Sequence, residues 1–134
     1  MFLLDTDTLI YFLKGHGAVV ENFKAHASKP KAISVVTYGE LVYGAHKSER
    51  NAENLAKVRR LAELYPVMDI TRAIMDSFGE IKAELSSRGT TVDDFDLQIG
   101  CTALALNYTV VTNNQKHFQK IPGLKVENWA EQIG

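Results

Sequence analysis

The chain contains one cysteine, Cys101, among its 134 residues, so it cannot form an internal disulfide. A single thiol is typical of proteins from a reducing compartment. No apolar stretch approaches the roughly 20 residues that cross a bilayer, and no signal-peptide pattern is visible at the N-terminus. These absences argue against a secreted or membrane protein, and we expect a cytoplasmic location.

The chain also lacks an excess of charge of either sign, because 15 lysines and arginines face 16 acids and the net charge is −1. A general basic field that would attract nucleic acid is therefore absent. Acids loaded with a divalent cation would reverse the local charge, so composition leaves a nucleic-acid partner open. The length fits one domain, and we expect residues 1–134 to form it.

Several motifs of known chemistry are missing as well. The four histidines show neither HxxxH nor HExxH spacing, which argues against a zinc site. No P-loop, GxGxxG or GxSxG motif occurs. Zinc hydrolases, nucleotide-binding folds of these types and serine hydrolases are accordingly disfavoured.

Short apolar runs alternate with helical periodicities along the chain, which predicts a parallel sheet flanked by helices. Because right-handed crossovers join such strands, their carboxyl ends lie on one side of the sheet. The expected strands are residues 3–5, 32–36, 66–70, 108–112 and 124–127. The expected helices are residues 8–14, 19–27, from 37 onward, 50–64, 71–88 and 95–107.

Three acids occur at comparable strand-to-helix junctions of this pattern: Asp5, Glu40 and Asp96. In open α/β sheets, ligands bind at the carboxyl ends of the strands. Three carboxylates gathered there would repel one another unless a cation compensates. Since carboxylate oxygens suit hard cations, the pattern favours a magnesium-like site and a metal-dependent enzyme.

Each acid also has a purely local interpretation. Asp5 is a suitable helix cap, Thr37-x-x-Glu40 has the form of a capping box, and Asp96 lies at a helix start, where negative charge is favourable. Taken one by one these interpretations suffice, but the convergence of the three acids favours the metal site.

The fourth predicted strand leads into Thr112-Asn113-Asn114, which would bring neutral oxygens to the same edge of the sheet. The alternative is a plain turn, because asparagine tolerates left-handed backbone geometry. His117, just beyond, is the histidine least easily explained as a surface or packing residue. Cys101 lies in the most apolar predicted helix, so we expect a buried, unreactive thiol.

Residues 9–13 and 35–43 are apolar around nearly the whole helix. A helix of this kind must bury more than one face. Neighbouring helices could cover the additional face, or a partner chain could. Oligomerisation or a protein ligand is therefore one of the two interpretations.

Five motifs occur in order along almost the whole chain, and together they resemble the PIN-domain endoribonucleases, specifically the VapC toxins of toxin–antitoxin pairs. The similarity is greatest to the enteric branch, whose members cut initiator transfer RNA. The motifs are Leu3-Leu4-Asp5-Thr6-Asp7, residues 33–45, Phe95-Asp96-Leu97-Gln98-Ile99, Val110-Val111-Thr112-Asn113-Asn114, and Ile121-Pro122-Gly123-Leu124 with Glu127-Asn128-Trp129.

This resemblance implies a three-layer α/β/α sandwich with Asp5, Glu40 and Asp96 as the catalytic acids. Asp5 and Asp96 would bind Mg²⁺ or Mn²⁺ directly, and Glu40 would complete the shell or hold a metal-bound water. The polar residues expected to support the cofactor site are Thr6, Thr112 and Asn114. Similar enzymes leave a 5′-phosphate and a 3′-hydroxyl.

The resemblance also implies partners: a VapB-like antitoxin that covers the active site, an RNA substrate, and a second copy in a homodimer. One departure concerns the metal site. Many relatives carry a further acid after the fourth strand, where this chain has Asn113, Asn114 and His117. Fewer negative charges should weaken a second metal site, so a two-metal mechanism is not assumed.

Two other functions fit parts of the sequence. Asp5-Thr6-Asp7-Thr8-Leu9 satisfies the DxDxT opening of haloacid-dehalogenase-like phosphatases, although the later acidic pair Asp93-Asp94 does not follow an apolar strand and Glu40 has no role there. A PIN-like domain that binds RNA or protein without cutting is the non-enzymatic alternative. The clustered acids argue against it, and the missing further acid argues slightly for it.

Overall fold

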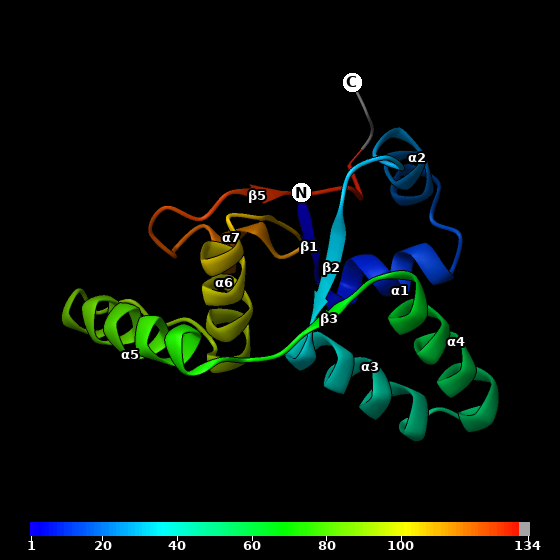
Figure 1. The fold of residues 1–134 in the computed structure, drawn as a ribbon, viewed down its shortest axis with the longest axis horizontal. Coiled ribbons are helices and arrows are strands. Elements are labelled where there is room, and N and C mark those ends of the chain that lie inside the picture. The colour runs from blue at the N-terminus through cyan, green and yellow to red at the C-terminus, as the bar shows by residue number, and fades with distance from the viewer. Residues whose placement is uncertain (132–134) are drawn as a thin grey trace.

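The computed structural model describes residues 1–131 and contains a central five-stranded parallel sheet between two layers of helices (Figure 1). The strand order is β3-β2-β1-β4-β5, so the first strand lies at the centre. The strands are β1 (Phe2–Leu4), β2 (Lys31–Ser34), β3 (Val67–Met68), β4 (Thr109–Val111) and β5 (Val126–Glu127).

The helices separate by sequence onto the two faces of the sheet, with the first four on one side and the last three on the other (Figure 1). The first group is α1 (Thr6–Leu13), α2 (Gly17–Ala25), α3 (Val35–Lys47) and α4 (Asn51–Leu64). The second group is α5 (Arg72–Ser87), α6 (Asp94–Leu106) and α7 (Gln115–Phe118). The expected three-layer α/β/α sandwich is confirmed.

The apolar character of β1 follows from its central position. Its side chains alternate, as in any strand, so Phe2 and Leu4 enter the core on one face while Leu3 enters the core on the other. All three are buried. A strand with helices on both faces has no solvent side, which is why this segment reads as a continuous apolar run.

The junction between β2 and α3 differs from the expectation. The strand ends at Ser34, and the helix already begins at Val35, because the Ser34 hydroxyl accepts a hydrogen bond from the Val36 N–H (3.2 Å). The proposed capping box is therefore wrong: Thr37 lies inside the helix and is buried. The Glu40 side chain is left free for another role.

Other parts of the prediction agree more closely. The apolar α6 is buried along its middle, and Cys101 is fully enclosed there, where burial raises the pKa of its thiol to about 11. The short α7 was not expected.

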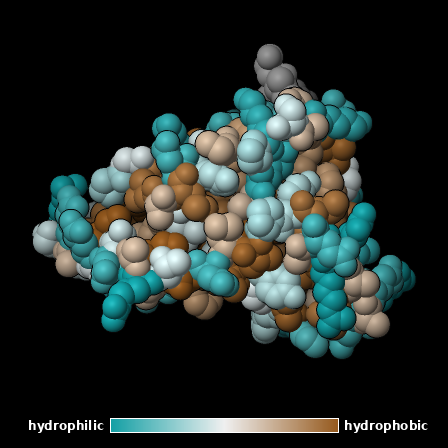
Figure 2. All heavy atoms as spheres, in the orientation of Figure 1, coloured by the Kyte–Doolittle hydropathy of each residue, from teal (hydrophilic) through white to brown (hydrophobic). Residues whose placement is uncertain are grey.

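Figure 2 shows that hydrophobic side chains on the visible face are scattered in small groups. Within residues 1–131, no helix is both long and apolar enough to span a membrane.

Candidate active site

Asp5 directly follows β1, at the carboxyl edge of the sheet, and its side chain is buried. It occupies the cap position of α1 without bonding to that helix's N–H groups through its side chain. Instead, its Oδ2 accepts a hydrogen bond from the Thr112 hydroxyl (2.8 Å). Burial, followed by the charge of Asp7, raises the pKa of Asp5 to about 7, against the hydrogen bond from Thr112. Simple helix capping is thus not what this carboxylate does.

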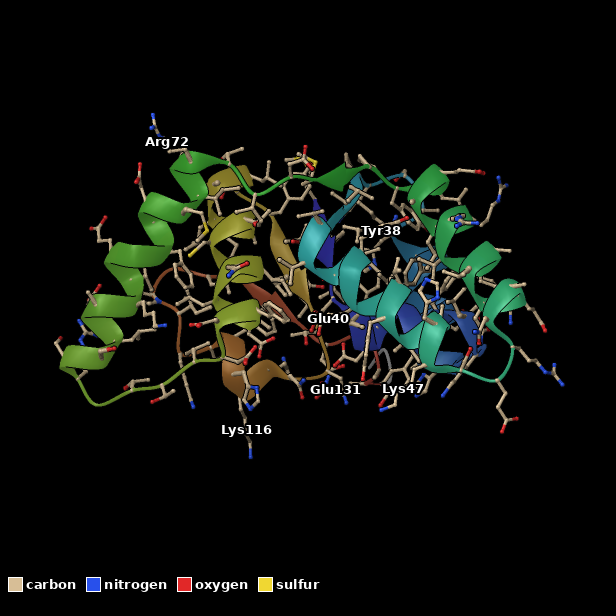
Figure 3. All side chains as sticks on the ribbon, turned by 90° about the horizontal axis from the view of Figure 1, so that it is seen from below. Tyr38, Glu40, Lys47, Arg72, Lys116 and Glu131 are labelled. Atoms are coloured by element: carbon tan, nitrogen blue, oxygen red, sulfur yellow. The ribbon has the colours of Figure 1, made fainter. Side chains whose placement is uncertain are left out.

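Glu40 reaches the same edge from the second turn of α3. Its Oε1 accepts a hydrogen bond from the Thr6 hydroxyl at the start of α1 (3.0 Å). Burial raises the pKa of Glu40, and the negative charges of Asp96, Asp93 and Asp7 add to the rise. In Figure 3, Glu40 lies on the side of α3 that is turned toward α6.

Asp96 enters from the first turn of α6, which Asp93 caps by accepting the N–H groups of Phe95 (3.1 Å) and Asp96 (3.4 Å). An Asp96 carboxylate oxygen lies 3.3 Å from Nδ1 of His117 on α7. Burial raises the pKa of Asp96, whereas the contact with His117 lowers it. His117 is therefore a direct neighbour of a candidate metal ligand.

Asp7 is a fourth acid of this cluster, one to which the sequence assigned no role. Its carboxylate accepts the N–H of Thr8 (2.7 Å) and that of Asn113 (3.1 Å). Burial raises the pKa of Asp7, and its charge in turn raises the pKa of Asp5, Glu40 and Asp96. Its position in the first turn of α1, two residues after Asp5, could have indicated this from the sequence.

The loop after β4 is tied to its neighbours by its asparagines. The Asn113 side chain donates to the Tyr11 hydroxyl (3.4 Å) and accepts from the Asn128 amide (3.1 Å). The backbone N–H of Asn114 donates to the Thr112 hydroxyl (3.0 Å), which itself donates to Asp5. The loop thus positions Thr112, while the expected contact of Asn114 with a cofactor stays a prediction.

The donor set suits a hard divalent cation, because it consists of carboxylates with hydroxyl and amide support. Within residues 1–131, however, no three His, Cys, Asp or Glu side chains converge as a complete metal-binding group. Each acid instead keeps a hydrogen-bond partner of its own: Thr112 for Asp5, Thr6 for Glu40 and His117 for Asp96. The carboxylates still raise one another's pKa, so this edge of the sheet carries negative charge that no nearby cation neutralises in full.

A groove of about 400 Å³ runs from Glu40 between α1, α3 and α4. Apolar side chains of all three helices line it, and two lysines, Lys14 and Lys57, lie among them. The apolar lining consists of Ile10, Leu13, Leu41, Ala45 and Val58. The apolar runs noted in the sequence at residues 9–13 and 35–43 therefore contribute to one surface beside the acids.

Comparison with known proteins shows the family to which this chain belongs. The model of the PIN domain matches residues 2–124. This chain belongs to the PIN domain family. It is 37% identical to the tRNA(fMet)-specific endonuclease VapC of Salmonella typhimurium, over 96% of this chain and 98% of that protein. It is 33% identical to the ribonuclease VapC2 of Rickettsia felis, over 96% and 98% of the two chains.

Solved structures agree. The DNA-bound VapBC complex of Salmonella typhimurium contains a chain 37% identical to this one, with a TM-score of 0.87 over 96% of this chain and 97% of that one. The VapBC2 complex of Rickettsia felis, bound to a DNA fragment from the promoter, gives a TM-score of 0.87 at 32% identity, over 96% and 98% of the chains. The resemblance to VapC ribonucleases is confirmed, and the haloacid-dehalogenase alternative is left without support. PIN-domain ribonucleases in general depend on a divalent metal.

Proposed function

We propose that this chain is a metal-dependent endoribonuclease and the toxin of a toxin–antitoxin pair. The observation that carries the proposal is the gathering of Asp5, Asp7, Glu40 and Asp96 at one sheet edge, in a chain of the VapC family. Such a cluster is unfavourable by itself, because neighbouring negative charges repel one another and are partly buried. A bound divalent cation would neutralise this repulsion, and the carboxylates would then hold the cation for catalysis.

The roles follow from the position of each acid. Asp5 and Asp96 are the proposed direct metal ligands, and Glu40 completes the shell or orients a water molecule. Asp7 adds negative charge and anchors the loop after β4. Thr112 and Thr6 hold Asp5 and Glu40 by hydrogen bonds, as residues behind metal ligands commonly do. Asn114 is the third proposed supporting residue.

We propose Mg²⁺ or Mn²⁺ as the cation. When bound, it supplies an activated water and shields the charge of the phosphate. Attack of the water oxygen on phosphorus and breakage of the bond to O3′ would leave a 5′-phosphate and a 3′-hydroxyl. In this step the carboxylates orient the water in line with the bond that breaks, and a proton passes to O3′.

Transfer RNA, and initiator transfer RNA in particular, is the proposed substrate. The relatives in Salmonella typhimurium and Shigella flexneri, each 37% identical over 96% of this chain, are both named tRNA(fMet)-specific endonucleases. Specificity of this kind depends on contacts beyond the acids, so it needs a direct test with purified RNA.

A small VapB-like antitoxin is the proposed partner, seated in the groove between α1, α3 and α4. The groove is apolar, leads to Glu40 and carries Lys14 and Lys57, which suits an amphipathic segment with some acidic residues. An occupant there would cover the approach to the acids. Inhibition would follow from blocked access of RNA.

We further propose a homodimer, because Tyr43 on α3 is 65% exposed although it is a large aromatic residue. Light scattering on the purified protein tests this, and a monomer would contradict it. The chain is proposed to act as one PIN domain over residues 1–134, in the cytoplasm.

The test of the proposed function is cleavage by purified protein free of antitoxin. Total and initiator transfer RNA are each incubated with Mg²⁺, with Mn²⁺ and with EDTA, beside an Asp5→Asn protein. We expect discrete products that require metal and vanish in the variant. End-labelling of the products identifies the 5′-phosphate.

Each other result has a defined meaning. Metal binding without cleavage of either RNA would favour a binding role. Cleavage that survives undiminished in Asp5→Asn would oppose the assigned role of Asp5. Phosphatase activity lost in Asp7→Asn but kept in Asp96→Asn would favour the dehalogenase-like chemistry instead.

A further inference from the structure

Phe95 is an aromatic residue left at the surface directly beside a candidate metal ligand. It is 54% exposed, although it belongs to a helix that is otherwise buried along its middle. The Asp93 carboxylate accepts the N–H groups of both Phe95 and Asp96, so the backbone of the two residues is fixed together. Their Cα atoms are about 3.8 Å apart, as for any neighbours. The backbone of Phe95 is therefore held next to that of Asp96, and its ring is exposed.

Two lysines contact residues that precede Phe95 in the chain. Lys82 of α5 pairs with Asp94 (2.8 Å), the residue before Phe95. Lys120 donates to the carbonyl of Thr91 (3.5 Å), in the segment that leads into α6. Lys116 of α7 points away from the body of the molecule (Figure 3). The surface around Phe95 thus combines an exposed aromatic ring with lysines that partly offset the charge of the neighbouring acids.

The ion pair between Lys82 and Asp94 is easily exchanged. About half of each of these side chains is exposed, and pairs at such positions contribute little to stability. Lys82 could turn from Asp94 to a phosphate oxygen at small cost. The same holds for the long contact of Lys120 with a backbone carbonyl.

We propose that Phe95 is a stacking platform for one unpaired base of the RNA substrate, next to the phosphate that is cut, with Lys82 and Lys120 contacting neighbouring phosphates. This rests on the proposed function and deepens it by specifying how the substrate is held. Proteins that bind single-stranded RNA stack exposed bases on aromatic side chains and follow the backbone with cations. The bases of a continuous duplex are stacked on one another, so the platform selects a loop or an unpaired end.

The experiment measures RNA affinity in an Asp5→Asn background, where the RNA is expected to stay intact. The probes are initiator transfer RNA and a single-stranded oligoribonucleotide, followed by fluorescence anisotropy. We expect Phe95→Ala and Phe95→Leu to weaken binding by at least about fivefold, because neither residue offers a π face. Phe95→Trp should retain it. Leu64→Ala is the matched control, since Leu64 is 52% exposed and lies at the far end of α4.

Phe95→Trp also gives a spectroscopic signature. RNA should quench the emission of the new tryptophan, whereas the native Trp129, only 1% exposed, supplies a steady background. Melting followed by circular dichroism verifies that each variant is folded. The quenching and the loss of affinity in Phe95→Leu separate stacking from simple apolar contact.

The outcomes distinguish this inference from the function on which it rests. Equal RNA affinity of Phe95→Ala and Leu64→Ala would overturn the platform and leave the nuclease intact. A dimer that dissociates in Phe95→Ala, with RNA affinity unchanged, would overturn it in favour of an interface between copies. Absence of both cleavage and RNA binding by the unmodified chain would overturn the function together with the platform.

Discussion

The Thr112 hydroxyl donates a hydrogen bond of 2.8 Å to the Asp5 carboxylate across the junction of two adjacent strands. The register Leu4↔Val111 brings these residues opposite each other although they are 107 positions apart. The N–H of Asp5 donates to the Val111 carbonyl as well (2.9 Å). Both the backbone and the carboxylate of Asp5 are therefore held by the end of β4.

Replacing Thr112 by valine removes the donor to Asp5 while keeping the shape of the side chain. We expect Thr112→Val to lower Mn²⁺ affinity and single-turnover cleavage by about 10- to 100-fold, as removal of a group behind a metal ligand commonly does. Thr112→Ser should restore most of both. The control is Thr102→Val, since Thr102 is equally buried but donates to the Gln98 carbonyl inside α6. Equal losses in the two valine variants would contradict the role of Thr112.

The stability of the metal-free protein should fall as pH rises. The pKa of an aspartate is ordinarily 3.8, whereas that of Asp5 in the folded chain is about 7. Between these pH values the folded state therefore binds more protons than the unfolded state does. Unfolding free energy therefore decreases as pH increases through this window. With EDTA, the protein should melt several degrees lower at pH 7.5 than at pH 5, and Asp5→Asn should reduce that difference.

The same linkage predicts the effect of metal removal and return. A cation that binds the ionised acids competes with protons, so Mg²⁺ or Mn²⁺ should raise the melting temperature more at pH 7.5 than at pH 5. Thermal melting of the EDTA-treated and reloaded protein measures this. Stabilisation of equal size at the two pH values, or none, would contradict a metal site at these acids.

His117 should limit how strongly the site binds a cation. Its imidazole lies 3.3 Å from Asp96, where a carboxylate would add negative charge. We expect His117→Asp to tighten Mn²⁺ binding several-fold and to destabilise the metal-free protein, since like charges then stand together. His117→Asn provides a neutral comparison. Two tight sites in the unmodified protein, by calorimetric titration, would show that the imidazole imposes no such limit.

The groove beside Glu40 should be separable from catalysis. Leu13 lines it and is 37% exposed, so a charge there would oppose an apolar partner. We expect Leu13→Asp to abolish capture of the co-expressed antitoxin, while metal-dependent RNA cleavage stays near normal. Leu64→Asp, outside the groove, is the control. Unchanged capture by Leu13→Asp would place the antitoxin elsewhere.

Trp129 should be essential for stability although it follows the last strand. Its ring packs edge-on against Phe2 (4.9 Å) and Phe23 (5.2 Å) and stacks on His26 (4.8 Å). Loss of a buried tryptophan costs about 3–5 kcal/mol. Urea denaturation of Trp129→Ala should show a loss in that range, whereas a loss below about 1 kcal/mol would mean that the segment is not part of the core.

Much of the fold could be predicted because its signals are local. A continuous apolar run such as Phe2–Leu4 is typical of a strand covered on both faces, and the long periodic helices were predicted to within a few residues. The errors arose where neighbouring signals compete. At Ser34 a capping hydroxyl ends the strand earlier than the apolar run suggested, and the four-residue α7 is too short to show a period.

The sequence by itself determined the α/β alternation and the position of Asp5 between β1 and α1, since both follow from residue order and hydrophobic period. The expected strand-to-helix junctions were wrong for the other two acids: Glu40 lies in the second turn of α3, and Asp96 lies in a helix that follows α5. Only the tertiary structure decided which group each carboxylate contacts: Thr112 for Asp5, Thr6 for Glu40 and His117 for Asp96. It also brought Asp7 into the cluster and left Phe95 exposed beside it. These relationships depend on the register of β1 with β4 and on how the helices pack, and no local pattern encodes a contact between residues so far apart in the chain.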